Sequence, residues 1–183
     1  MTHIALLRAV NLAGLNKIGM ADLRELLAGL GFADAQTLLQ SGNVVFSGGN
    51  QPTAVLEDTL ERAAARRLGL ETEFFVRTAK EWQAIVAANP FPRQAKDDPS
   101  HLLAVILKGD VSAANVSALQ KAIVGREVVR AKGRCAYIVY PDGIGRSKLT
   151  TALIEKTLGT RGTARNWNTV LKLQARCQTS SGT

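Results

Sequence analysis

Cysteine is nearly absent from this chain of 183 residues, which contains only Cys135 and Cys177. Neither stands in a metal-ligand spacing such as C-x2-C, so we predict no metal site. Two free thiols suit a reducing compartment, and a single disulfide between them is the alternative. No apolar run approaches the roughly 20 residues needed to span a bilayer. Arg8 also interrupts the first apolar run, so we expect no signal peptide, no membrane segment and a cytoplasmic protein.

Histidine and aromatic side chains are also scarce, and this weakens two classes of function. The two histidines each begin a predicted strand, and the carboxylates are scattered, so acid–base catalysis has little support. The aromatic pattern of RNA-recognition motifs is missing, because Lys132-Gly133 is followed by Arg134-Cys135-Ala136. Tyr137 and Tyr140 are three apart on a predicted strand and point to opposite faces. We predict no cofactor, and whether the protein is an enzyme stays open.

Acidic residues are few in the last third of the chain. Residues 1–120 hold 11 Lys and Arg against 12 Asp and Glu, whereas residues 121–183 hold 12 against 3. The whole formal charge of +8 therefore comes from the C-terminal part. Such a segment indicates an anionic partner. A solvated basic surface is the alternative interpretation.

Hydrophobic periodicity in the first half predicts a β-α-β-β-α-β order. A hydrophobic content of 46% is enough for a core without disulfides or metal. The predicted elements are strand 3–10, helix 20–30, strand 35–40, strand 44–47, helix 56–68 and strand 73–78. The turn Ser41-Gly42-Asn43 joins the second and third strands as a hairpin. This order is the ferredoxin-like, or split βαβ, arrangement.

The second half repeats the pattern after a linking helix. That helix carries Trp82 and ends near Asn89-Pro90, and a polar loop follows to Pro99. The later elements are strand 101–108, helix 116–123, hairpin strands 127–131 and 134–140, helix 147–158 and strand 163–167. Leu68-Gly69 before a strand matches Leu158-Gly159 before the last strand, which supports a tandem repeat. A helix over 163–177 is the alternative.

The predicted fold is α+β, with two tandem ferredoxin-like (βαββαβ) units and mostly antiparallel sheets. The first unit covers residues 1–78, and a linking helix with a proline-bounded loop covers 79–100. The second unit with a C-terminal helix covers 101–177, and residues 178–183 are a disordered tail.

Several short segments, in order along the chain, carry a resemblance to a known family. They are Leu6-Leu7-Arg8, Asn16-Lys17-Ile18-x-Met20, Gln40-Ser41-Gly42-Asn43-Val44-Val45-Phe46, Asn89-Pro90-Phe91, Ser147-Lys148-Leu149-Thr150 and Thr163-x-Arg165-Asn166-Trp167-Asn168-Thr169. Together they resemble the bacterial family catalogued as domain of unknown function 1697, over roughly residues 3 to 173. Ala9 departs from the glycine usual in that family. The resemblance implies an uncharacterised α+β protein and no particular activity.

The main candidate site is the stretch Gly143-Ile-Gly-Arg-Ser-Lys-Leu-Thr150, which follows a predicted strand and begins a helix. It lacks the G-x4-G-K-[ST] spacing of NTPase phosphate loops. A helix capped by Ser147 nevertheless offers free N–H groups and a positive dipole end beside Arg146 and Lys148. These three residues are therefore predicted to bind an anion. An ordinary helix cap with two solvated cations is the alternative.

Two further sets of residues are weaker candidates. Arg165 suits a bidentate pair with a phosphate or carboxylate, and Trp167 suits stacking on a planar group. The alternative is a core Trp and an Arg bound to backbone carbonyls. Arg8, Asn16 and Lys17 lie after the first strand and are secondary candidates. We expect the turn at 41–43 to lie at the opposite end of the sheet, where the first strand begins.

The sequence does not identify the function, but it favours one hypothesis over two alternatives. The leading hypothesis is binding of a phosphorylated or carboxylated small molecule at the helix N-terminus after Gly145. The alternatives are low-specificity nucleic-acid binding through the basic C-terminal third, or a protein-interaction module. The sequence does not define the oligomeric state.

Overall fold

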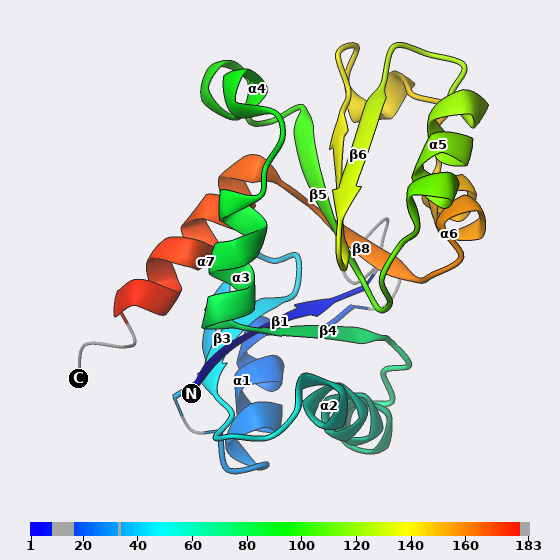
Figure 1. Ribbon diagram of the computed structural model, residues 1–183. Coiled ribbons are helices and arrows are strands. Elements are labelled where there is room, and N and C mark those ends of the chain that lie inside the picture. Colours follow the sequence, from blue (N-terminus) through cyan, green and yellow to red (C-terminus); the bar gives the residue numbers. More distant parts are fainter. Residues whose placement is uncertain (9–16, 33, 180–183) are drawn as a thin grey trace. The chain divides into compact units, whose positions relative to one another are not determined.

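The protein divides into two compact units, seen in a computed structural model that describes residues 1–8, 17–32 and 34–179 (Figure 1). Unit 1 comprises Met1–Ala84 with Leu173–Thr183, and unit 2 comprises Ile85–Lys172. Ala9, Asn16 and the end of the predicted tail lie outside the described residues. Both units show the predicted ferredoxin-like order, so the fold class is confirmed.

Unit 1 contains one antiparallel sheet of four strands in the order β2-β3-β1-β4. Its elements are β1 (Thr2–Leu7), α1 (Met20–Ala28), β2 (Gln36–Leu38), β3 (Asn43–Ser47), α2 (Thr53–Leu68) and β4 (Phe74–Thr78). The helices α1 and α2 lie side by side on one face of the sheet (Figure 1). Alternate strand residues such as Ala5 and Leu7 share the hydrophobic core with Leu23 and Leu60 of these helices.

The hairpin turn of unit 1 lies at the end of β1, and the sequence-based placement at its beginning is wrong. Leu7 donates its backbone N–H to Gly42 O at 2.8 Å. Because β3 follows the turn and runs antiparallel to β1, Asn43 pairs with Leu6 and Ser47 with Thr2. The turn therefore lies beside Leu7, the last residue of β1.

Unit 2 repeats this topology, with strands in the order β6-β7-β5-β8 and all pairs antiparallel. Its elements are β5 (Leu102–Leu107), α5 (Ala113–Ala122), β6 (Val128–Lys132), β7 (Cys135–Val139), the 3-10 helix η1 (Ile144–Arg146), α6 (Thr151–Leu158) and β8 (Gly162–Asn166). The helices α5 and α6 lie side by side (Figure 1). Leu119 and Ile154 from these helices pack with Val105, Ile138 and Tyr140 of the sheet. Tyr137 points to the opposite face, as the alternation predicts.

Corresponding residues end the second long helix of each unit. Gly69 follows α2 with a φ of +59°, and Gly159 follows α6 with a φ of +73°. Both adopt the left-handed conformation that glycine permits at a helix C-terminus. The last strand of each unit then carries a buried arginine, Arg77 in β4 and Arg165 in β8. These shared features support the tandem repeat that the sequence indicates.

Two helices follow β4, where the sequence predicted one helix and a polar loop. They are α3 (Ala79–Ala87) and α4 (Pro92–Asp97). Pro92 occupies the first position of α4, where its missing N–H costs no hydrogen bond. The short α4 buries none of its residues, so it has no apolar face to indicate a helix in the sequence.

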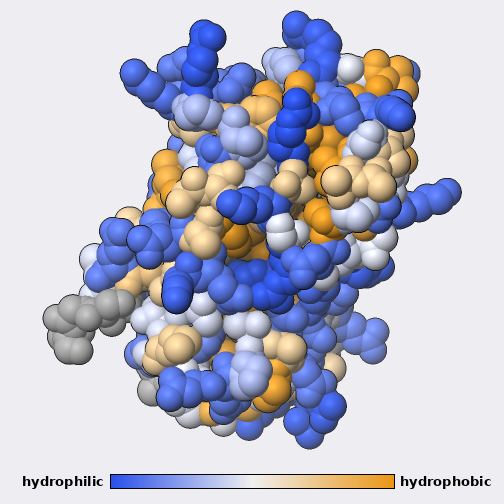
Figure 2. All heavy atoms as spheres, in the orientation of Figure 1, coloured by the Kyte–Doolittle hydropathy of each residue, from blue (hydrophilic) through white to orange (hydrophobic). Residues whose placement is uncertain are grey.

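The chain continues from β8 into α7 (Trp167–Thr179). Residues 162–166 are therefore a strand, which decides against the helical alternative there, and Trp167 begins the next helix instead of ending the strand. No helix within the described part of the chain combines the length and apolar character that a membrane crossing needs. Hydrophilic side chains cover much of the visible face, with hydrophobic patches between them (Figure 2).

Candidate functional site

The loop between β7 and α6 carries three of the predicted binding residues. It leaves the sheet at Tyr140, whose backbone N–H donates to His101 O at 2.8 Å. Gly143 then adopts a φ of +82°, a conformation that is strained for residues with a side chain. The chain passes through η1 and reaches α6 only at Thr151. Arg146 therefore ends η1, and Ser147 and Lys148 lie in the short segment between η1 and α6.

Ser147 does not cap α6, and this part of the sequence-based prediction is wrong. Thr150 is the N-cap, and its hydroxyl accepts a hydrogen bond from Leu153 N at 3.2 Å. Both Ser147 and Thr150 are residue types that cap helices, so the sequence offered two candidates. The hydroxyl of Ser147 is engaged elsewhere, because it accepts from Leu149 N at 3.0 Å and donates to Glu127.

Glu127 is the buried acidic residue that binds the loop through Ser147. The residue is only 8% exposed, and its Oε1 accepts the hydrogen bond from the Ser147 hydroxyl. Its Oε2 is buried and has no hydrogen-bond partner among residues 1–8, 17–32 and 34–179. A buried carboxylate is costly unless its oxygens are bonded or paired with a cation. The Oε2 atom therefore lacks the hydrogen bond or ion pair that normally offsets the cost of burying a carboxylate oxygen.

The position of Glu127 is fixed by the neighbouring helix. Gln120 of α5 donates its Nε2 to Glu127 O at 3.1 Å and accepts from Val129 N at 2.9 Å. One side chain thus satisfies backbone groups on both sides of residue 128, where β6 begins. This clamp places the carboxylate opposite the loop that carries Ser147.

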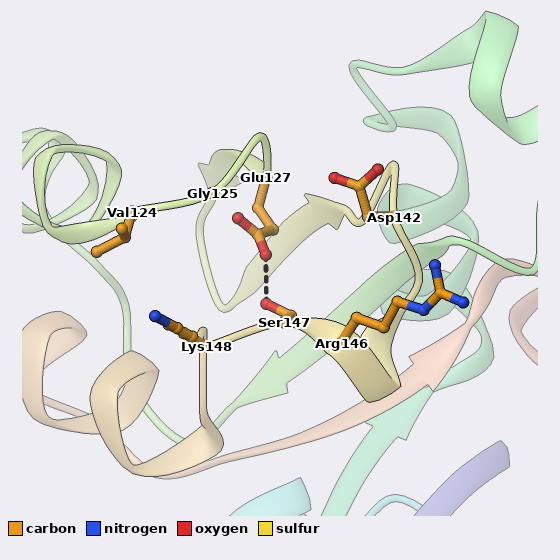
Figure 3. Close-up of a pocket in the computed structure, with 7 residues that line it drawn as sticks. All are labelled: Val124, Gly125, Glu127, Asp142, Arg146, Ser147 and Lys148. Carbon is orange, nitrogen blue, oxygen red and sulfur yellow. Dashed lines mark hydrogen bonds between the residues drawn. The ribbon is translucent and has the colours of Figure 1, made fainter.

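A pocket of about 260 Å³ lies between these two segments. Its lining residues are Val124, Gly125, Glu127, Asp142, Arg146, Ser147 and Lys148. In Figure 3 the Glu127 carboxylate points toward Ser147 at the centre of this group. Lys148 and Val124 lie on one side of that pair, and Arg146 and Asp142 lie on the other. The volume is slightly below the usual range for ligand pockets, so it suits a small molecule.

The charges around the pocket do not cancel. Arg126 donates its Nε–H to Asp142 Oδ2 at 3.0 Å, and its Nη2 donates to Asp142 Oδ1. The two hydrogen bonds form a bidentate pair. These hydrogen bonds lower the pKa of Asp142 below its ordinary value. Besides the paired Asp142, the pocket is lined by the buried Glu127 and by two exposed cations, Arg146 and Lys148, whose charged ends point to opposite sides in Figure 3. The pocket therefore presents one anion and two cations to whatever enters it.

Tyr140 lies behind the pocket in the core of unit 2. Burial raises the pKa of its phenol to about 12, and the negative charge of Glu127 adds to the effect. Tyr140 is therefore a neutral phenol at physiological pH. Its ring belongs to the hydrophobic core and supports the wall that carries Glu127.

Arg165 and Trp167 do not line this pocket. Arg165 is 9% exposed, and its Nη1 donates to Thr163 Oγ1 at 2.9 Å and Ala164 O at 2.8 Å. Burial lowers the pKa of its guanidinium to about 10. Trp167 is also buried, with its ring centroid 6.3 Å from that of Tyr137. These contacts favour the structural alternative for both residues.

Of the secondary candidates, Arg8 and Lys17 belong to unit 1 and are not among the residues that line this pocket. Arg8 forms an ion pair with Glu73 at 3.6 Å, and Lys17 is exposed. Asn16 lies outside the described residues. A site made by these three residues stays a prediction.

The sequence analysis missed Glu127, the residue that most distinguishes the pocket. It is one of only three acidic residues among the last 63, and that rarity was a usable signal. The Asp142–Arg126 pair was also not predicted, because 16 positions separate its members in the sequence. Val124 was also not predicted. Its side chain is 82% exposed, and this exposure is visible only in the structure.

The arrangement suits binding better than nucleophilic catalysis. The Ser147 oxygen accepts from Leu149 N while its proton is directed to Glu127, which holds the hydroxyl in a structural role. Within residues 1–8, 17–32 and 34–179, no three His, Cys, Asp or Glu side chains gather as a metal site would require. The charged groups that line the pocket can form ion pairs and charge-assisted hydrogen bonds.

Comparisons with known proteins agree with the fold. The sequence model of a family described as "Protein of unknown function (DUF1697)" matches residues 1–137. The match includes Glu127 and ends before the loop that carries Ser147. Among curated proteins, none matches the chain. A solved structure, that of the conserved bacterial protein SP0830 from Streptococcus pneumoniae, is similar with a TM-score of 0.73 and 20% identity. The similarity covers 95% of this chain and 97% of that one and shows a shared fold.

Proposed function

The chain belongs to the DUF1697 family of proteins of unknown function, and we propose that it binds a small phosphorylated or carboxylated molecule in the pocket beside Ser147. The observation that carries the proposal is the pair of exposed cations, Arg146 and Lys148, on a pocket with a buried polar centre. A concave site with cationic side chains and a polar group to orient the ligand has the properties that a specific anion site needs.

Lys148 is the exposed cation of the pocket whose ammonium group is most readily reached by a ligand. Among the described residues it has no hydrogen bond or ion pair, and Figure 3 shows it beside the pocket. Arg146 lies on the other side of the pocket, where it acts on Asp142 through space. An anion between the two gains charge-assisted hydrogen bonds without first breaking a strong ion pair of Lys148.

The helix dipole contributes little to this site. Because α6 begins only at Thr151 and Thr150 caps it, the positive end lies beyond the residues that line the pocket. The dipole term is about 0.3–1 kcal/mol even for a charge in the first turn. The affinity must therefore come from the side chains, and the substitution of Lys148 is the sharpest test.

The experiment measures the melting temperature of the full chain with inorganic phosphate, sugar phosphates, nucleotides and organic acids. A ligand present at 100 times its dissociation constant stabilises a protein by about 2.7 kcal/mol. For a chain of this size the melting temperature then rises by roughly 5–10 °C. Lys148→Gln should remove most of the shift. Lys156→Gln, which removes an exposed charge from α6 away from the pocket, should leave it unchanged.

Two outcomes count against the proposal. One is that none of the anions raises the melting temperature of the wild-type protein. The other is that Lys148→Gln retains the full shift while Lys156→Gln behaves identically. The second result would mean that an anion binds elsewhere on the chain.

Binding of nucleic acid through the basic segment remains the alternative proposal, and it predicts a different response to salt. Tyr137 and Tyr140 are both buried, so neither offers its ring to a base. Binding would then depend on the phosphate backbone, and its affinity would fall steeply with salt, with a slope near −0.9 per phosphate contacted on a duplex. Oligonucleotide retention at about 50 mM salt that disappears at higher salt would support this alternative.

A further inference from the structure

The free oxygen of Glu127 is the feature of the pocket that an anion alone does not explain. A ligand with only negative charge gains from Lys148 and Arg146 but is repelled by a carboxylate a few atoms away. Glu127 is nine-tenths buried, and Ser147 donates the one hydrogen bond found for its carboxylate in the described part of the chain. An ionised carboxylate has acceptor positions for about four hydrogen bonds, so most of its capacity is unused.

The free oxygen of the carboxylate lies against Gly125, which also lines the pocket. The backbone of Gly125 lies so close that a Cβ at this position would be 2.3 Å from Glu127 Oε2. In Figure 3 the oxygen that does not bond Ser147 points toward the side on which Lys148 and Val124 lie. The last torsion of a glutamate is soft, so a small turn of the carboxylate presents this oxygen to a donor in the pocket.

We propose that the pocket selects ligands that carry a protonated amine together with the anionic group. The amine donates to Glu127, and the phosphate or carboxylate of the same molecule binds Lys148 or Arg146. This inference rests on the proposed function, since it names the class of ligand for the same pocket. The chemistry is that of aminoalkyl phosphates and amino acids, in which the two charges are separated by a few bonds.

The charge arrangement supports this choice of ligand. An anion without an amine leaves the Glu127 charge unpaired and adds a second negative charge beside it. An amine without an anion meets two cations at the same pocket. Only a molecule with both groups satisfies each charged side chain, so the two interactions should reinforce each other.

The test compares two probes of nearly equal size, O-phosphoethanolamine and ethyl phosphate, which differ by the amine. Their dissociation constants for the full chain are measured by calorimetric titration near neutral pH. A hydrogen-bonded charge pair with Glu127 should make the amine-bearing probe bind roughly ten- to a hundredfold more tightly. The pair β-alanine and propionate repeats the comparison for carboxylates and shows which anion the pocket prefers.

Glu127→Gln should reduce the preference for the amine to less than about twofold, because a neutral amide attracts no cation. The same variant should bind ethyl phosphate at least as well as the wild type. Asp110→Asn, which removes one exposed charge outside the pocket, should keep the full preference.

The failure of this inference differs from the failure of the proposed function. Equal binding of both phosphate probes by the wild type would overturn the inference and leave the anion site standing. Retention of the preference in Glu127→Gln would also overturn it, because another group would then bind the amine. If no probe binds the wild type, the anion site itself is wrong, and the inference is refuted with it.

Discussion

Removal of the Ser147 hydroxyl is the perturbation with the most definite energetic consequence. Ser147→Ala deletes the hydrogen bond to Glu127 Oε1 and also the acceptor for Leu149 N. The carboxylate would then be nine-tenths buried with neither oxygen bonded. A buried polar group without a partner costs about 1–3 kcal/mol, and a charged group costs more. We expect the free energy of unfolding of unit 2 to fall by about 3 kcal/mol at neutral pH.

A double-mutant cycle isolates the part of this cost that comes from the charge. In the Glu127→Gln background the same substitution leaves only a neutral amide with fewer bonds, so its cost should fall to about 1 kcal/mol. The difference, about 2 kcal/mol, lies within the range measured for residues that share a hydrogen bond. Ser117→Ala serves as the matched control, because Ser117 is an exposed serine of α5 outside the pocket.

Urea denaturation followed by the fluorescence of Trp167 measures these energies in unit 2. Trp82 belongs to unit 1, so a Trp82→Phe background removes its separate signal. The reasoning is refuted if Ser147→Ala costs less than about 0.5 kcal/mol. It is equally refuted if the cost is the same with and without the Glu127 charge, since the hydroxyl would then not be compensating a buried carboxylate.

The remaining predictions concern stability and titration. Thr150→Ala should destabilise the protein by about 1 kcal/mol through loss of the α6 cap, as measured by urea denaturation, and an equal stability would contradict the reassignment of the cap. Gly159→Ala should cost about 1 kcal/mol because its φ of +73° strains a side chain, whereas an unchanged melting temperature would argue against this backbone conformation. The hydrogen bond from His101 lowers the pKa of Asp98 below 3.8, so the resulting stability is present above that pH and is lost as pH falls through the folded-state pKa. In an NMR titration His101→Asn should return the pKa of Asp98 toward 3.8, and an unchanged value would show that His101 is not the cause.

The order of the elements was predictable because it depends on local patterns. The continuous apolar run Leu102–Leu107 and the helical spacing in Thr53–Leu68 each lie within one short segment. The glycines after α2 and α6 also mark the helix ends directly in the sequence. Once β-α-β-β-α-β is recognised twice, the ferredoxin-like topology follows from the pairing rules.

The candidate site was only half predictable, because its central interaction is not local. Arg146, Ser147 and Lys148 attract attention as neighbours in a glycine-containing loop. Glu127 lies 20 positions earlier, and nothing in the linear sequence relates it to Ser147. Its unbonded oxygen is a property of three-dimensional packing, so it was visible only in the structure.

The start of α6 shows a different limit of sequence reasoning. Ser147 and Thr150 are both suitable N-caps, and both adopt an extended backbone conformation. The choice between them depends on Glu127, which engages the Ser147 hydroxyl, and on the burial of Leu149. Tertiary contacts thus decide a boundary that local preference leaves open.

The position of a bound anion tests the central claim most directly. Backbone amide shifts of the full chain, followed by NMR during titration with O-phosphoethanolamine, report that position without a substitution. Binding in the pocket predicts saturable shifts at Arg146, Ser147 and Lys148 and at Gly125 and Glu127, with smaller changes elsewhere. Saturable shifts confined to residues outside this pocket, or no saturable shifts at all, would contradict the account.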